Sequence, residues 1–184
     1  EIFMQLFIRY GQGVFFDLMR QHAGIGRESL ESILVQCRTE MDRTELMESV
    51  PVPHSEVFNS AFRQLFEITL IQKGLYKENE DIIINCFRES SLPWAQQCVL
   101  VSAVTIHLLH FFNEDAMLLL FRLTSHSNAE IRQRALVGLY LVLFKYDKRT
   151  SLYPEVTSQI QKLRQGNVKQ DVLRGIIIQL LRTL

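Results

Sequence analysis

Apolar residues recur every three or four positions along most of this chain, which is the spacing of one face of an α-helix. The stretches with this spacing are residues 2–21, 27–48, 55–73, 79–90, 93–112, 114–125, 128–146, 153–165 and 167–183. No stretch favours a strand. The sequence therefore predicts an all-α protein in which short and long helices alternate from residue 55 onward.

Residues 128–146, with the sequence NAEIRQRALVGLYLVLFKY, show the helical pattern most clearly. Asn128 suits the N-cap position, because its short side chain can accept hydrogen bonds from the N–H groups of the first turn. The apolar stripe of this helix consists of Ile131, Ala135, Leu139 and Val142. We therefore expect a helix that begins after Asn128 and buries this stripe.

The pattern repeats at intervals of 35 to 39 residues. The longer helices are expected to start near Ser55, Pro93, Asn128 and Asn167. Two of the shorter segments share the string ED-x5-FR at an offset of 34 residues, beginning at Glu80 and Glu114. Self-similarity of this period indicates stacked helix pairs, because each pair has an apolar face that it cannot bury alone.

When the other long helices are aligned with residues 128–146, two of them show apolar residues at matching positions. These are Val57, Ala61 and Leu65 in one helix, and Val168, Val172 and Ile176 in another. The register of the helix at 93–112 stays open between an offset of 34, from the ED-x5-FR match, and an offset of 36, from placing Ser102 on Gly138.

The string Ile131-Arg132-x-x-Ala135-x-x-x-Leu139 resembles the V-R-x-x-A-x-x-x-L signature of HEAT repeats. The resemblance is explicit for one repeat. It implies an α-α superhelix, a HEAT- or armadillo-like solenoid of about four helix pairs. It also implies a structural role for Arg132, since the matching arginine of HEAT arrays commonly ties neighbouring repeats together. The alternative fold is an irregular helical bundle.

We expect one helical-repeat domain over residues 1–184, with N-terminal helices in 1–50 and regular helix pairs in 54–184. The 184 residues are enough for a sizeable core, and 47% of them are hydrophobic. The first residue is not methionine and residues 2–7 already show helical spacing, so we expect a fragment of a longer chain. The longest apolar run, residues 98–112, is shorter than the roughly 20 residues of a membrane span.

Charged side chains are distributed unevenly along the chain. Residues 1–128 carry 10 basic and 16 acidic side chains, a net of −6, whereas residues 129–184 carry 10 and 4, a net of +6. Solvated helix surfaces are one explanation. The sharper hypothesis is a docking surface for an acidic protein partner, built from basic residues that lie off the apolar stripes. The predicted partner-binding residues are Lys148, Arg149, Lys162, Lys169 and Arg174.

Nucleic acid is the second candidate partner. Some HEAT-like proteins are DNA glycosylases, and aromatic residues such as Trp94 and Phe144 could line a base-stacking groove here. However, the chain has 20 basic and 20 acidic residues, so its overall charge gives no reason to bind nucleic acid. A duplex-sized footprint also calls for a denser basic stripe.

One constellation resembles a metal site: His107-x-x-His110 with Glu114, which would share a face on an uninterrupted helix. We expect Asn113 to end that helix, which misplaces Glu114 and leaves two partly buried core histidines. No metal ion is therefore expected to bind there.

The three cysteines, Cys37, Cys86 and Cys98, include no C-x-x-C pair. They fit buried thiols in a reducing compartment. No glycine-rich segment follows a strand, as a nucleotide site would require. The leading hypothesis is thus a non-enzymatic, cytoplasmic protein-interaction scaffold without a cofactor. The alternatives are a HEAT-like nucleic-acid-binding or DNA-repair protein that uses its basic C-terminal third, and a helical accessory domain of a larger enzyme.

Overall fold

The computed structural model describes residues 27–45, 55–71, 75–88 and 92–165. Every regular element within these ranges is a helix, so the predicted all-α class is confirmed for them. The chain divides into two compact units, residues 1–86 and 87–184. No helix of the described ranges combines the length and the apolar character that a membrane crossing needs.

The first unit contains α2 (Arg27–Glu45), α3 (Glu56–Ile71), α4 (Leu75–Glu78) and α5 (Glu80–Cys86). α2 packs along α3 and also contacts α5. Ser55 joins the first two helices, because its Oγ donates to Glu40 Oε2 at 2.7 Å and accepts from the Phe58 amide at 3.1 Å. The core residues of α2 are Leu30, Ile33, Leu34 and Cys37, and those of α3 include Phe58, Ala61, Leu65 and Ile68.

Two predictions for this unit were wrong in detail. Val57 was placed on the buried stripe of α3, but 45% of it is exposed and Phe58 is buried instead. The helix predicted at 79–90 is shorter, ending at Cys86, and the short helix α4 precedes it. Asn79 separates the two and is buried, with 3% exposed, so this break lies inside the packed part of the unit.

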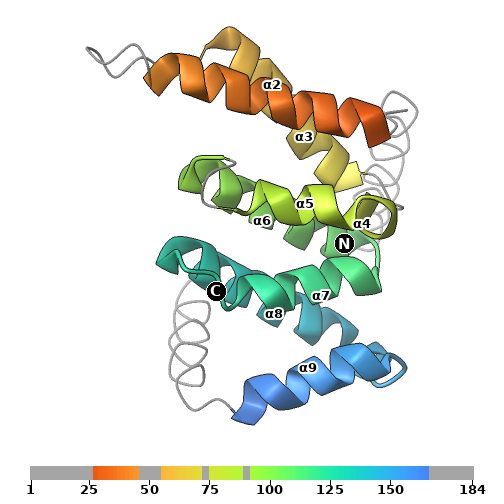
Figure 1. The fold of residues 1–184 in the computed structure, drawn as a ribbon. Coiled ribbons are helices and arrows are strands. Elements are labelled where there is room, and N and C mark those ends of the chain that lie inside the picture. Colours follow the sequence, from red (N-terminus) through yellow and green to blue (C-terminus); the bar gives the residue numbers. More distant parts are fainter. Residues whose placement is uncertain (1–26, 46–54, 72–74, 89–91, 166–184) are drawn as a thin grey trace, which may run out of the picture. The chain divides into compact units, whose positions relative to one another are not determined.

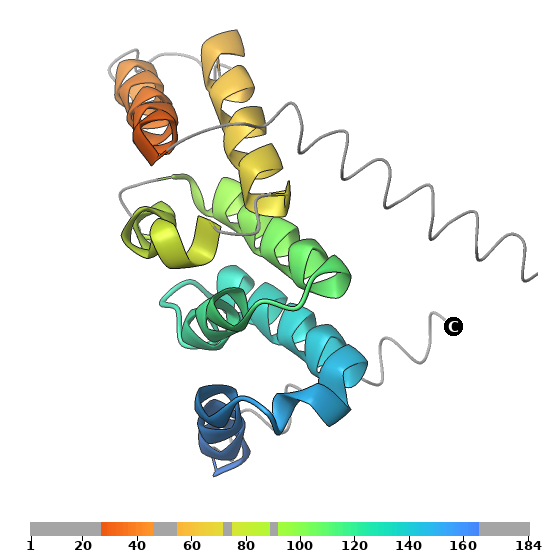
Figure 2. The ribbon, with the colours of Figure 1, turned by 90° about the vertical axis from the view of Figure 1, so that its right-hand side faces the viewer.

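The second unit contains α6 (Trp94–His110), α7 (Glu114–Leu123), α8 (Ala129–Thr150) and α9 (Pro154–Gln165). α6 and α8 lie side by side, α7 packs against both, and α9 packs against α7 (Figures 1 and 2). The core between them consists of side chains such as Val101, Val104, Leu108, Met117, Leu120, Ile131, Ala135 and Val142. The predicted stripe of α8 is therefore confirmed as its buried face.

Asparagine side chains begin two helices of this unit. Asn128 Oδ1 accepts from the amides of Glu130 at 2.9 Å and Ile131 at 3.3 Å, as predicted. Asn113 Oδ1 accepts from the Ala116 amide at 2.9 Å and starts α7. α8 continues beyond the predicted end at 146, but Tyr146 has a non-helical φ of −112° and ψ of 20°, so a kink marks that position.

Burial along α6 distinguishes the two registers that the sequence left open. An offset of 34 places Gln97 and Val101, which are both buried, on Ile131 and Ala135 of α8. An offset of 36 would place the exposed Ala95 on Ile131. The offset of 34 is the one that matches buried positions with buried positions.

Candidate binding groove between α6 and α8

α6 and α8 approach each other closely at Gly138. A Cβ atom built on Gly138 would lie 2.1 Å from Thr105 Oγ1, which is closer than two such atoms can come. The Thr105 hydroxyl donates to the Val101 carbonyl of its own helix at 2.9 Å. Glycine is therefore required for the observed separation of the two helices.

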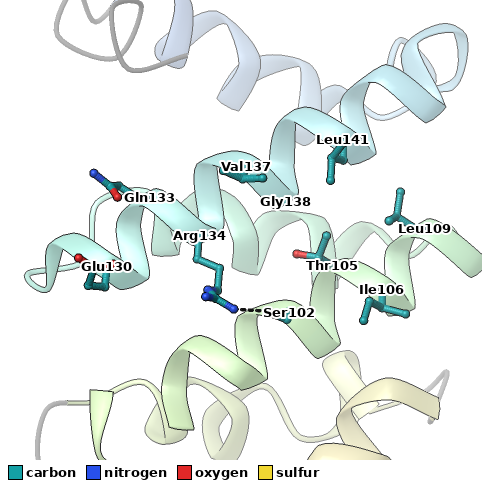
Figure 3. Close-up of a pocket in the computed structure, with 10 residues that line it drawn as sticks. All are labelled: Ser102, Thr105, Ile106, Leu109, Glu130, Gln133, Arg134, Val137, Gly138 and Leu141. Carbon is teal, nitrogen blue, oxygen red and sulfur yellow. Dashed lines mark hydrogen bonds between the residues drawn. The ribbon is translucent and has the colours of Figure 1, made fainter. Parts of the chain in front are cut away.

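An open groove with a volume of about 440 Å³ runs along this contact (Figure 3). α6 contributes Ser102, Thr105, Ile106 and Leu109, and α8 contributes Glu130, Gln133, Arg134, Val137, Gly138 and Leu141. The middle of this lining is apolar, and the first turns of α8 provide its charged and amide groups. The groove can thus bury apolar side chains of a bound molecule, while its own charged groups contact that molecule at one end.

The groove uses a different face of α8 from the one that forms the core. Glu130, Arg134 and Leu141 each directly precede a residue of the buried stripe, and one residue corresponds to a turn of about 100° around a helix. Consequently the same helix packs into the unit on one side and lines the groove on another.

Two cationic side chains reach from α8 to α6: Arg134, which lines the groove, and Lys145, which lies one turn beyond the lining residue Leu141. Arg134 Nη1 donates to Ser102 Oγ at 3.0 Å (Figure 3). Eleven residues later, Lys145 Nζ donates to the carbonyl of Leu109, one of the last carbonyls of α6, which have no partner within their own helix. The apolar part of the lining therefore lies between two positive charges.

Phe144 extends the apolar surface beyond the groove. It follows Val137 by seven residues, or two helical turns, and therefore lies on the same face of α8. Its side chain is 80% exposed. Single exposed apolar residues are common, but this one continues the row formed by Val137 and Leu141.

The described residues that were predicted to bind a partner do not line this groove. Lys148 and Arg149 are exposed in the last turn of α8, and Lys162 is exposed on α9. The guanidinium carbon of Arg149 lies 5.3 Å from the ring centroid of Phe112, so this charge also takes part in packing. Lys169 and Arg174 lie outside the described residues.

The sequence prediction missed Arg134 and Lys145 as site residues, although both belong to the basic C-terminal third. A usable signal exists in the sequence, because Arg134, Leu141 and Lys145 follow one another at intervals of seven and four residues. That spacing marks one face of a helix. What the sequence does not contain is the position of α6, whose side chains form the other wall.

Both histidines were predicted to be partly buried in the core; this holds for His110, whereas His107 is buried completely. His107 is fully buried, and its ring centroid lies 5.7 Å from that of Phe111. His110 is half-buried; burial, with a second contribution from Lys145, lowers its pKa. α6 ends at His110, so Glu114 belongs to the next helix. The described residues contain no cluster of three groups able to hold a metal ion.

All three cysteines are buried, free thiols. Burial raises the pKa of Cys37 to about 11 and that of Cys86 to about 12. Burial also raises the pKa of Cys98, with Arg134 acting in the opposite direction. Because the thiolate is the reactive form, these pKa values favour the predicted inert role.

The groove and its cations are the features of the described residues most suited to binding another molecule. No family model, curated protein or solved structure matches this chain. The chemistry of the groove is therefore the guide to function.

Proposed function

We propose that this chain is a non-enzymatic protein-interaction module and that a segment of a partner protein binds in the groove between α6 and α8. The single observation behind the proposal is the groove itself, an open apolar surface between two cations. Apolar segments of partners commonly bind in such grooves, where their side chains leave water.

We also propose that the helix pairs form a HEAT-like solenoid. In the second unit, α6 and α8 lie in one layer while α7 and α9 lie in the other (Figure 2). The burial-matched offset of 34 residues between α6 and α8 agrees with the ED-x5-FR repeat. In stacked helix pairs, the second helices together form an extended surface, which is where such proteins bind partners.

Arg132 does not hold neighbouring helix pairs together through its guanidinium in the way that the HEAT resemblance implies. Its Nη1 donates to the carbonyls of His126 and Ser127, in the turn directly before α8. Arg134 makes the α8-to-α6 connection instead, through Ser102. The proposed solenoid would thus use an arginine two residues later for the contact between pairs.

The basic C-terminal third contributes to the proposal in a second way. Lys148, Arg149 and Lys162 are exposed and continue the positive charge of Lys145. Such charges speed the encounter with an acidic partner more than they tighten the final complex. The buried, free thiols favour a reducing compartment such as the cytoplasm.

A photo-crosslinking experiment tests the proposal. A photoreactive amino acid replaces either Gln133, an exposed residue of the groove, or Gln161, an exposed glutamine of α9 that serves as the matched control. In an extract of the source cells, we expect the probe at 133 to capture a discrete protein that the probe at 161 does not capture. The captured protein is then purified and mixed with the chain.

Leu141→Asp should weaken the complex between the purified proteins, because it places a charge in the apolar lining. Equal capture at both positions, or a complex indifferent to Leu141→Asp, would contradict the proposal. A labelled DNA duplex serves as the second probe. Tight binding that falls steeply as salt rises would replace the protein partner with nucleic acid.

A further inference from the structure

We infer that the groove between α6 and α8 binds an acidic amphipathic helix, with apolar residues spaced i, i+4 and i+7 and carboxylates near both ends. This inference rests on the proposed function and specifies its partner. It is derived from the apolar row along α8, the wall that α6 provides, and the two cations.

The spacing of the apolar row on α8 predicts the spacing of the apolar residues on the partner helix. Val137, Leu141 and Phe144 follow one another at intervals of four and three residues along α8. Ile106, which is 37% exposed, and Leu109 form the opposite wall. A helix whose apolar residues share this periodicity can place them between the two walls, as helical peptides do in apolar grooves.

The cations set the length and the charge of the partner. Arg134 and Lys145 are eleven residues apart on α8, which corresponds to about 16 Å at about 1.5 Å per residue. A helix lying along the groove therefore meets both cations with carboxylates about eleven residues apart. Lys148, three residues after Lys145 and beyond the kink at Tyr146, adds positive charge to the last part of α8.

Both cations have donors to spare for carboxylates. One hydrogen bond of Arg134 goes to the Ser102 hydroxyl, and one of Lys145 goes to the Leu109 carbonyl. Both acceptors are neutral. A guanidinium has five N–H donors and an ammonium has three, so each can bind a carboxylate in addition. Bonds between two charged groups are the stronger kind.

An acidic helix fits better than a nucleic acid. The surface between the two cations is apolar, and the side chains of a helix fill it whereas a sugar–phosphate backbone does not. Duplex binding is therefore an alternative outcome of the test.

The test uses two synthetic helical peptides and the full chain. Both carry leucines spaced i, i+4 and i+7 and a fluorescent label; one has glutamates near both ends and the other has lysines there. Fluorescence anisotropy at low salt measures their affinities. We expect the glutamate peptide to bind about tenfold more tightly or better, with a preference that shrinks as salt screens the charges.

Charge reversal provides the decisive variant. Arg134→Glu with Lys145→Glu should invert the preference, so that the lysine peptide binds more tightly. Arg63→Glu with Lys77→Glu is the matched control, since both residues are exposed and belong to the first unit, outside the groove. It changes the net charge equally and should leave the preference intact. If the reversed variant melts early, Arg134→Gln with Lys145→Gln should abolish the preference without inverting it.

The outcomes separate this inference from the proposed function. Equal affinity for both peptides, no binding of either, or a preference that the groove variants do not change would overturn the inference. The proposed function would stand in those cases if Leu141→Asp still weakens the complex with the captured protein. Displacement of the glutamate peptide by a DNA duplex that itself binds tightly would identify nucleic acid as the occupant and overturn both.

Discussion

Gly138 shows how one missing side chain determines the distance between two helices. Thr105 occupies the space where a Cβ would lie, and its own hydrogen bond to Val101 fixes the position of the hydroxyl. The shape of the groove depends on this contact, because both residues belong to its lining.

Gly138→Ala should lower the free energy of unfolding by about 1–3 kcal/mol, because the added methyl group overpacks the contact. Chemical denaturation measures the change. Thr105→Ala in the same chain should recover part of the loss, since the Thr105 side-chain atoms nearest the new methyl group are then absent. A wild-type free energy of unfolding for Gly138→Ala would show that the two helices do not approach as described.

His110 makes the stability depend on pH. Burial and Lys145 lower its pKa below the usual 6.5, so the unfolded chain binds a proton first as the pH falls. The contribution of His110 is therefore fully present above about pH 6.5 and is lost as the pH falls through the lowered pKa. His110→Gln should reduce the loss of stability on acidification, as thermal melts across this range would show. If His110→Gln left the pH profile of stability unchanged, His110 would not be the source of this pH dependence.

At the scale of single helices, the asparagine caps determine where α7 and α8 begin. Asn128→Ala removes the acceptor of two backbone amides. We expect it to cost about 1 kcal/mol of folding free energy, whereas Asn128→Asp, which keeps the acceptor, should cost less. The difference between the melting curves of the two variants measures the contribution of the Asn128 acceptor to stability. Equal losses for both variants would contradict the predicted role of the cap.

The helices could be predicted where periodicity and caps agree. α8 is the clearest example, with Asn128 at its start and its stripe buried. Val57 and Phe58 of α3 show the limit, because both are apolar and neighbours differ by only one position in the helical register. The tertiary packing buries Phe58 and leaves Val57 exposed. The groove was not predictable, because its second wall comes from α6, some thirty residues earlier.

At the scale of the whole molecule, the net charge of +6 in residues 129–184 gives the C-terminal third a long-range field. Arg149 also takes part in packing, because its guanidinium carbon lies 5.3 Å from the ring centroid of Phe112. A contact of this kind contributes about 0.5–1 kcal/mol at an exposed site.

Reversing charge at Lys148 and Arg149, which are exposed, and at Lys169, which the sequence predicts to lie off the apolar stripe, should leave the melting temperature within a few degrees of wild type, since exposed charges contribute little to folding. Association with an acidic partner should slow, and its salt dependence should flatten. Stopped-flow mixing with the captured protein measures both effects. Extensive unfolding of this variant would mean that these charges hold the structure together.

The contact between Gly138 and Thr105 also restricts how this protein can change during evolution. A larger residue at Gly138 destabilises the fold while threonine faces it, but the pair can change together without that loss if position 105 first becomes alanine or glycine. Among orthologous chains, the two positions should therefore covary, with their summed side-chain volume kept small. The order of substitutions is constrained as well, because the step that shrinks position 105 must come first if that loss is to be avoided.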